Sequence, residues 1–240
     1  MFNPNTRDTT SVVDVSALRV EIRPLMRLVY MWMTVGLLTT ALIAMIVSGS
    51  EALLAVVLNP VVLIGSIVLQ VGLVIGISAG LRRMSPDLAG VLFFLYAGLN
   101  GFIFSLIFVA YDLGSIGLAF LTTAGLFGAM TVVGYTTKTD LTQFRSYFMM
   151  GLIGLLIAMI VNMFLGSGPL DFLISIVGVV LFTALTAYDT QRIKEMAADP
   201  TIEADGSLAA KLGILGALTL YLDFINLFLF LLRLFGGGRD

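Results

Sequence analysis

The chain has 240 residues, of which 59% are hydrophobic and only 12% are charged, and its mean hydropathy is +1.05. Soluble domains are about 45–50% apolar and about 25% charged, so this composition excludes an ordinary soluble protein. The net charge of -2, with basic residues scattered along the chain, argues against a nucleic-acid partner.

Apolar runs recur along the chain, each long enough to cross the hydrocarbon core of a bilayer. Residues 1–24 are polar and contain acids, so we expect a cytoplasmic N-terminal tail rather than a signal peptide. Residues 25–235 are expected to form one transmembrane domain, followed by a short C-terminal tail at 236–240. The sequence therefore predicts an all-α polytopic membrane protein, a bundle of seven transmembrane helices. The predicted spans are 25–48, 61–81, 88–110, 114–136, 146–165, 172–188 and 212–232.

Several short segments indicate where helices begin. The apolar run 52–57 is cut off by Asn59-Pro60, and we interpret it as a lip on the first external loop. Ser85 followed by Pro86 is typical of a helix N-terminus, and Asp140 with Gln143 three residues later is typical of another. Both starts are expected on the same face of the membrane.

Glycines recur at helical spacing in two spans. They are Gly72, Gly76 and Gly80 in the second span and Gly98 and Gly101 in the third. Small residues at this spacing let helix backbones approach closely in lipid, so we favour helix packing over the alternative that the second span contains hinges.

The distribution of Lys and Arg orients the bundle. With the N-terminus inside, only Arg233 and Arg239 lie outside, and the three short external loops contain acids (Glu51, Asp112 and Asp171) but no basic residue. Because basic residues favour the cytoplasmic side, the sequence predicts a cytoplasmic N-terminus and an external C-terminus. The internal basic residues are Arg7, Arg19, Arg23, Arg27, Arg82, Arg83, Lys138, Arg145, Arg192, Lys194 and Lys211.

The chain lacks residue types that much enzyme chemistry requires. It contains no histidine and no cysteine, which excludes Ser-His hydrolysis, an HExxH zinc site, imidazole ligation of haem, and thiolate chemistry. It also has no glycine-rich phosphate loop in a suitable context. We therefore expect a protein that is not an enzyme and has no cofactor.

Two acids remain as candidates for function. Asp223 lies in the middle of the apolar run TLYLDFINLFLFLL, where an ionisable residue costs roughly 2.5–3.5 kcal/mol and tends to mark an ion or proton pathway. The alternative, a neutral Asp223 that only hydrogen-bonds a neighbouring helix, is less favoured because Asn would serve as well. Asp189 ends the sixth predicted span in TAYDTQRIKEM, where pairing with Arg192 or Lys194 at the interface is an equally good interpretation.

AYDTQRIK and LYLDFINLF, together with GLRRMSPDLAG and YTTKTDL, resemble segments of the Bax inhibitor-1 family of membrane proteins. The resemblance covers residues 25–235 and implies a seven-helix bundle with the last helix at its centre. It also implies calcium leak controlled by pH through an aspartate pair, here Asp189 and Asp223. An arginine that latches the second helix to this pair is implied too, with Arg83 as the better match and Arg82 as the second. Bacterial members resemble regulators of an ATP-dependent membrane protease, and the lack of a eukaryotic targeting signal favours a bacterial inner membrane.

The physics of paired carboxylates agrees with these roles. Two carboxylates in contact are expected to share a proton, and when ionised they would supply part of an oxygen site for Ca²⁺. Asn226, backbone carbonyls or water would supply the other ligands. However, Asp189 is expected near the inner edge and Asp223 about 15–20 Å deeper, at 1.5 Å per residue. They meet only if the sixth helix continues inward or the seventh begins deep in a cavity.

Three functions therefore compete. The first is a pH-sensitive calcium leak channel, with Ca²⁺ as the transported ion. The second is a non-conducting regulator that binds an ATP-dependent membrane protease through residues 1–24. The third is a proton-coupled transporter. The loop 195–210 is longer than usual for the family, and its acids lack EF-hand spacing, so we interpret them as a solvated face rather than a calcium site.

Overall fold

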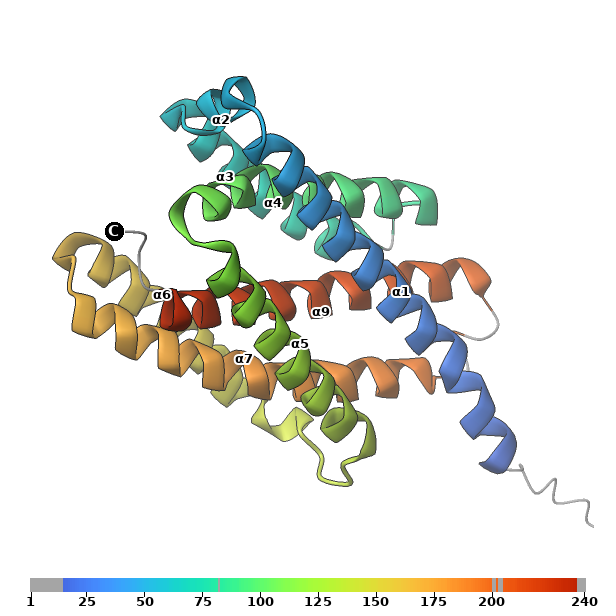
Figure 1. Ribbon diagram of the computed structural model, residues 1–240. Helices are drawn as coiled ribbons and strands as arrows, with labels where there is room; N and C mark the ends of the chain where they lie inside the picture. Colours follow the sequence, from blue (N-terminus) through green and yellow to red (C-terminus); the bar gives the residue numbers. More distant parts are fainter. Residues whose placement is uncertain (1–14, 82, 200–201, 203–204, 237–240) are drawn as a thin grey trace, which may run out of the picture.

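The computed structural model describes residues 15–81, 83–199, 202 and 205–236, with residues 15–24 described as backbone only. Over these residues the fold consists of helices and contains no strand (Figure 1). Seven of the helices are long and apolar enough to cross a membrane, which confirms the predicted fold class. The elements are α1 (Val15–Ser48), α2 (Glu51–Val57), α3 (Pro60–Gly80), α4 (Pro86–Ala110), α5 (Leu113–Thr136), η1 (Thr142–Phe144), α6 (Arg145–Leu165), α7 (Gly168–Ala197) and α9 (Gly206–Phe235).

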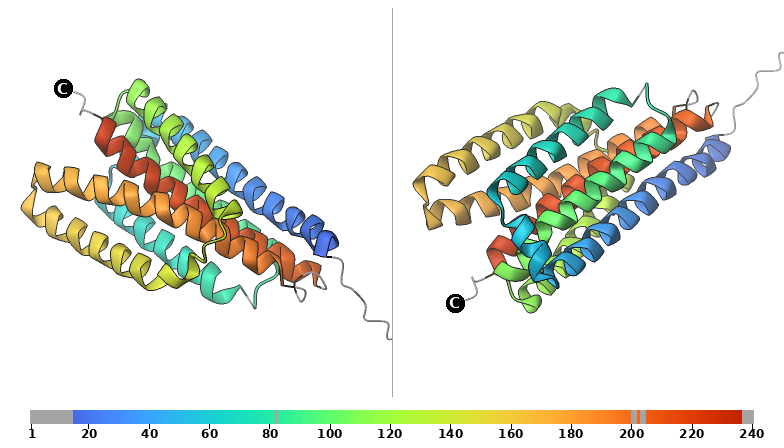
Figure 2. Two further views of the ribbon diagram at one scale, coloured as in Figure 1. Left: turned by 90° about the horizontal axis from the view of Figure 1, so that it is seen from below. Right: turned by 90° about the horizontal axis from the view of Figure 1, so that it is seen from above.

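The last helix, α9, is the centre of the bundle. It packs against α1, α4, α5 and α7, and the views of Figure 2 show the other helices arranged around it. In its most apolar stretch 72% of the residues are buried, against 6–39% in the other six spans. The core is therefore built around α9, while most side chains of α3 and α6 face outward, where only lipid can cover them.

Two hydrophobic clusters surround α9. One contains Val29, Phe93 and Tyr221 and joins α1, α4 and α9. The other contains Phe182 and Phe228 and joins α7 to the last turns of α9. In the first cluster an aromatic edge meets a face: the rings of Phe93 and Tyr221 lie 5.9 Å apart at 80°.

The predicted helix starts are confirmed in one case and corrected in the other. Ser85 caps α4, because the amide of Leu88 donates to its hydroxyl at 3.3 Å and Pro86 occupies the first turn. Asp140 instead lies just before the short turn η1, whose first amide, that of Thr142, donates to its carboxylate at 2.8 Å. The side chain of Gln143 donates to the carbonyl oxygen of Asp140 at 2.7 Å, so no capping box forms, and α6 begins only at Arg145.

Three helices extend beyond the predicted spans. The sixth span was predicted to end at 188, but α7 continues to Ala197, and the last span was predicted from 212, but α9 begins at Gly206. Hydropathy marks where apolar residues stop, whereas these helices continue as polar turns that pack on neighbours; Ile193, for example, is only 2% exposed. α1 likewise begins at Val15, inside the segment assigned to the tail, and the lip 52–57 is the helix α2.

The glycine pattern has a mixed outcome. A Cβ at Gly101 would lie 2.5 Å from the carbonyl oxygen of Thr40, so the packing interpretation is confirmed where α4 meets α1. The packing interpretation is wrong for Gly72 and Gly76, because nothing lies within 4 Å of a Cβ built at either position. α3 packs chiefly on α4 and α2, through a different face of the helix.

The described ends of α1 and α9 lie at opposite ends of the bundle (Figure 2). The connections that follow α3, α5 and α7 lie at the end where α1 begins, as the two similar helix starts predicted. We call this the inner end, following the charge argument. At the other end, Arg233 pairs with Asp171 at 3.9 Å.

Candidate functional site

Asp189 of α7 and Asp223 of α9 lie side by side inside the bundle. Asp189 is 8% exposed and Asp223 is 5% exposed, and their carboxyl groups are within hydrogen-bonding reach of each other. An ionised carboxylate only accepts hydrogen bonds, so a hydrogen bond between the two groups requires a proton on one of them. Two carboxyl groups this close can share a proton as one unit.

The depth mismatch expected from the sequence disappears in the structure. Because α7 continues to Ala197, Asp189 lies about 12 Å inside its end, at 1.5 Å per residue, and is buried in the bundle. Asp189 and Asp223 were expected to meet if the sixth helix continued inward past residue 188, and α7 does continue in this way. The end of the sixth helix was placed too early in the sequence-based prediction.

The α5–α6 connection holds α7 in place next to Asp189. Gly134 of α5 lies directly on the backbone of Ala187, where a Cβ would collide with the carbonyl oxygen. The side chain of Gln191 accepts from the amide of Leu141 at 2.7 Å and donates to the carbonyl of Thr139 at 2.9 Å. Sequence analysis missed Gln191, although it belongs to the AYDTQRIK motif, because its role depends on a partner fifty residues away.

The basic residues near Asp189 do not neutralise it by direct contact. Arg192 lies near enough to act on Asp189 electrostatically, but its side chain is exposed. The ammonium of Lys194 donates instead to the carbonyl of Tyr135 at 2.7 Å. In the described part of the chain neither residue forms an ion pair with Asp189, so the structure does not favour the interfacial-pairing alternative.

The structure brings together two of the four predicted site residues. Arg83 lies in the turn between α3 and α4, with an exposed side chain, and forms no ion pair with either aspartate among the described residues. Arg82 lies outside the described residues. The latch therefore remains a prediction.

The carboxyl pair has unused bonding capacity. Oδ2 of Asp223 is buried without a hydrogen-bond partner, and such a group calls for a ligand or a water. Over the described residues no cluster of three or more His, Cys, Asp or Glu side chains could hold a metal. The amide of Asn226 donates to the carbonyl of Leu222 on its own helix at 2.8 Å. The two carboxyl groups thus supply only a few of the six to eight oxygens that a Ca²⁺ ion takes.

A second polar cluster, which sequence analysis missed, lies on the opposite face of α9. The hydroxyls of Tyr221 and Thr40 are hydrogen-bonded at 2.7 Å, and Thr40 also donates to the carbonyl of Ala97 at 2.8 Å. This cluster joins α1, α4 and α9 deep in the core. The hydroxyls of Tyr221 and Thr40 satisfy each other, which is typical of a structural network.

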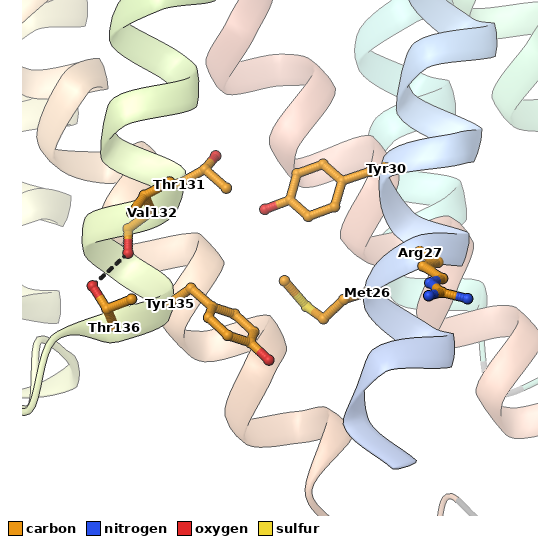
Figure 3. A pocket seen from close by; sticks show the side chains of 7 residues that line it. All are labelled: Met26, Arg27, Tyr30, Thr131, Val132, Tyr135 and Thr136. Carbon is orange, nitrogen blue, oxygen red and sulfur yellow. Dashed lines mark hydrogen bonds between the residues drawn. The ribbon is translucent and has the colours of Figure 1, made fainter. Parts of the chain in front are cut away.

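A cavity of about 480 Å³ lies between α1 and α5 toward the inner end (Figure 3). Figure 3 shows the hydroxyl of Tyr30 pointing across it toward Thr131. A second cavity, of about 280 Å³, lies between α1, α4, α5 and α9 and is almost entirely apolar. The residues that line the first cavity are Met26, Arg27, Tyr30, Thr131, Val132, Tyr135 and Thr136.

Comparison with known proteins agrees with the motifs. The family model described as Bax1-I, inhibitor of apoptosis-promoting Bax1, matches residues 22–240. The chain is 47% identical over 222 residues to the inner membrane protein YbhL of Escherichia coli K12, covering 92% of this chain and 94% of that protein. It is 46% identical over 209 residues to an uncharacterized protein of Borreliella burgdorferi, covering 87% and 89% of the two chains. An uncharacterized protein of Deinococcus radiodurans is 40% identical over 220 residues, covering 92% and 93%.

Proposed function

Because this integral membrane protein belongs to the Bax inhibitor-1 family, we propose that it is a pH-sensitive calcium leak channel. The observation that supports this function best is the contact between Asp189 and Asp223, two carboxyl groups buried in a seven-helix bundle. Carboxylates at this depth are costly and mark ion or proton pathways. The unpartnered oxygen of Asp223 adds a vacant acceptor at the same place.

In this proposal the carboxyl pair binds either protons or a passing Ca²⁺. A pair that holds protons presents little negative charge, so it attracts a divalent cation weakly. After deprotonation the same oxygens carry up to two charges and become hard ligands of the kind that Ca²⁺ prefers. Since Ca²⁺ takes six to eight oxygens, water and backbone carbonyls complete the shell, and the resulting weak binding lets the ion leave.

The moving element in the proposal is α3. Its main contacts are with α4 and α2 rather than with the central helix, and it is among the least buried spans. Arg83, in the turn that follows α3, is proposed to latch this helix to the ionised pair. Protonation of the pair removes its attraction for Arg83, frees α3 and favours opening of the channel. Lower pH would therefore favour opening while it weakens the binding of Ca²⁺ to the pair.

The proposed location is a bacterial inner membrane, with the N-terminus in the cytoplasm and the C-terminus outside. The name of the Escherichia coli relative supports the membrane, and the eleven basic residues assigned to the inner side support the orientation.

Calcium flux in reconstituted vesicles tests the function. We expect wild-type flux above that of protein-free vesicles and dependent on pH. Asp223→Asn keeps the shape but cannot titrate, so it should flatten the pH profile, and Asp189→Asn should act alike. Because the two groups form one unit, the double variant should be little worse than either single one.

The matched control is Asp87→Asn, which makes the same change at an exposed position in the first turn of α4 and should keep the wild-type profile. A full wild-type profile in Asp223→Asn would show that the acid is a packing detail. Wild-type flux no higher than that of empty vesicles would instead favour the second hypothesis, a regulator of a membrane protease. Deletion of residues 1–24 tests that hypothesis, since it should abolish binding to the protease.

A further inference from the structure

The cavity between α1 and α5 opens through the side of the bundle toward lipid. The two helices share α7 and α9 as neighbours without packing closely on each other, and Figure 3 shows Met26 and the ring of Tyr135 reaching into the space from opposite helices. Val132 and Tyr135 line the cavity from α5, and their side chains are 60% and 37% exposed. Both residues belong to a membrane span, so only lipid can cover the exposed parts.

The character of the cavity wall changes with depth. Arg27 is the third residue of the first span and Tyr135 is the last but one of the fourth, so both lie at the level of the membrane interface. Tyr30 and Val132 lie about 4.5 Å deeper on the same helices, at 1.5 Å per residue. There the hydroxyls of Tyr30 and Thr131 lie within reach of each other, so the wall presents mainly carbon to the cavity. A charge at the interface with an apolar space below it matches the headgroup and the first methylenes of a phospholipid.

The charges at the cavity favour an anionic lipid. Arg27 has an exposed side chain and, among the described residues, no acidic partner within ion-pairing distance. The ammonium of Lys194 lies 5.0 Å from the centre of the Tyr135 ring, and the described residues that line the cavity include no acid. The cavity is therefore positive at the end of the bundle that the charge pattern assigns to the cytoplasm. Basic pockets between membrane helices on that side are suited to anionic headgroups.

We propose that this cavity binds an anionic phospholipid of the inner leaflet. Its phosphate lies against the guanidinium of Arg27, while Lys194 adds positive potential and keeps its ammonium on the carbonyl of Tyr135. The first methylenes of one acyl chain occupy the space between Tyr30 and Val132. The cavity volume of about 480 Å³ falls within the range of about 300–1,000 Å³ that is usual for ligand sites. The bound lipid fills the gap between two helices that do not pack on each other, and the proposal is independent of calcium flux.

Native mass spectrometry of the purified full chain, titrated with lipid, tests the role of charge. We expect the first dioleoylphosphatidylglycerol to bind about fivefold tighter than dioleoylphosphatidylcholine, which has the same chains without the net charge, because one basic residue near a membrane surface has an effect of this size. Arg27→Gln should remove the preference and Arg27→Lys should keep it.

The matched control is Arg145→Gln, an exposed arginine at the start of α6. α6 packs on α7 and η1 rather than on α1, so this variant should keep the preference for the anionic lipid. Equal affinity of the wild type for the two lipids, or an equal loss in Arg27→Gln and Arg145→Gln, would overturn the proposal.

A second comparison tests whether the lipid occupies the cavity itself. Val132→Trp places an indole where the chain would lie and should remove the preference for phosphatidylglycerol. Val133→Trp is the control, because Val133 is the adjacent residue, is 45% exposed and does not line the cavity. Gel filtration checks that both variants fold, and Val132→Phe replaces Val132→Trp if the larger ring prevents folding. An unchanged preference when position 132 is filled would place the lipid elsewhere and contradict the proposal.

A soluble competitor separates a lipid from a free phosphate. Glycerol 3-phosphate carries the charged group without acyl chains, so an excess of it should not displace phosphatidylglycerol from the wild-type protein. Displacement by glycerol 3-phosphate would show that the site recognises phosphate alone and would overturn the assignment to a lipid.

Discussion

Asp223 and Tyr221 lie two positions apart on α9, and their surroundings differ in kind. Two residues along a helix correspond to a turn of about 200°, so the two side chains point to opposite faces. The hydroxyl of Tyr221 is fully buried and hydrogen-bonded to Thr40, whereas Oδ2 of Asp223 has no partner. A satisfied polar group fixes one packing arrangement, while an unsatisfied one leaves room for a ligand. This difference separates the scaffold from the candidate site.

At the same scale, Asp140 provides a prediction about pH. It lies outside the membrane-spanning segments, and hydrogen bonds from the hydroxyl and then the amide of Thr142 hold the pKa of its carboxyl below the usual value. A carboxylate whose pKa is lower in the folded state stabilises that state above the unfolded pKa and loses this effect as pH falls through the folded pKa. We therefore expect the amide of Thr142 to remain protected at neutral pH and to lose protection only below the ordinary Asp range.

Hydrogen exchange of the Thr142 amide, corrected for its intrinsic pH dependence, measures this effect. Asp140→Asn is the control, because an amide does not titrate in this range and the acid step should vanish. An unchanged step in Asp140→Asn would assign the titration to another group.

At the scale of elements, α3 and α4 show why one sequence pattern has two outcomes. Both carry closely spaced glycines, but of these only Gly101 of α4 faces another backbone. α4 is pressed against α1 by the Tyr221–Thr40 network, which binds the carbonyl of Ala97, while α3 lies at the periphery. Spacing shows that a close approach is possible, and the neighbour decides whether it occurs.

This contrast predicts opposite effects of the same substitution. Gly101→Ala would place a Cβ 2.5 Å from the carbonyl oxygen of Thr40, forcing α1 and α4 apart, and should destabilise the protein by about 1–3 kcal/mol. Gly76→Ala meets no neighbour and gains helix propensity, so it should be neutral or slightly stabilising, by at most about 1 kcal/mol. Thermal unfolding of both variants in the same detergent checks the pair. Equal stability of the two variants would contradict the packing assignment.

At the scale of the whole molecule, seven spans place the two ends of the described chain on opposite sides of the bundle (Figure 2). The distribution of charge indicates which side faces the cytoplasm. Arg27, Arg83, Arg192 and Lys194 all belong to the end where α1 begins. Basic residues in short connections are retained on the cytoplasmic side, which predicts that this end is cytoplasmic.

Reporter fusions test the orientation. A reporter that functions only outside the cytoplasm should be active when it is placed after Asp240 and inactive when it is inserted in the loop 195–210. A reporter that functions only in the cytoplasm should give the opposite result at both positions. To control for tolerance of the reporter, two insertions within one connection, which should report the same side, are compared with insertions in connections on opposite sides. Detection of both reporters on the same side would contradict the seven-span architecture.

The sequence by itself determined the number of membrane spans, the cap at Ser85 and the identity of the two aspartates. Each of these depends on short stretches of chain: hydropathy adds up over about twenty residues, a cap requires three or four, and an acid inside an apolar run is visible directly. The family resemblance extended this to the central position of the last helix and to the pairing of Asp189 with Asp223.

Only the tertiary structure decided whether the distant residues meet. It extended α7 past Asp189, placed Gln191 on the α5–α6 connection and brought the hydroxyl of Tyr30 close to those of Thr131 and Thr190. These features depend on which face of each helix meets which neighbour, and that choice is made by packing across the whole bundle, because lipid provides no hydrophobic drive to orient the helices individually. No local pattern in the chain records it.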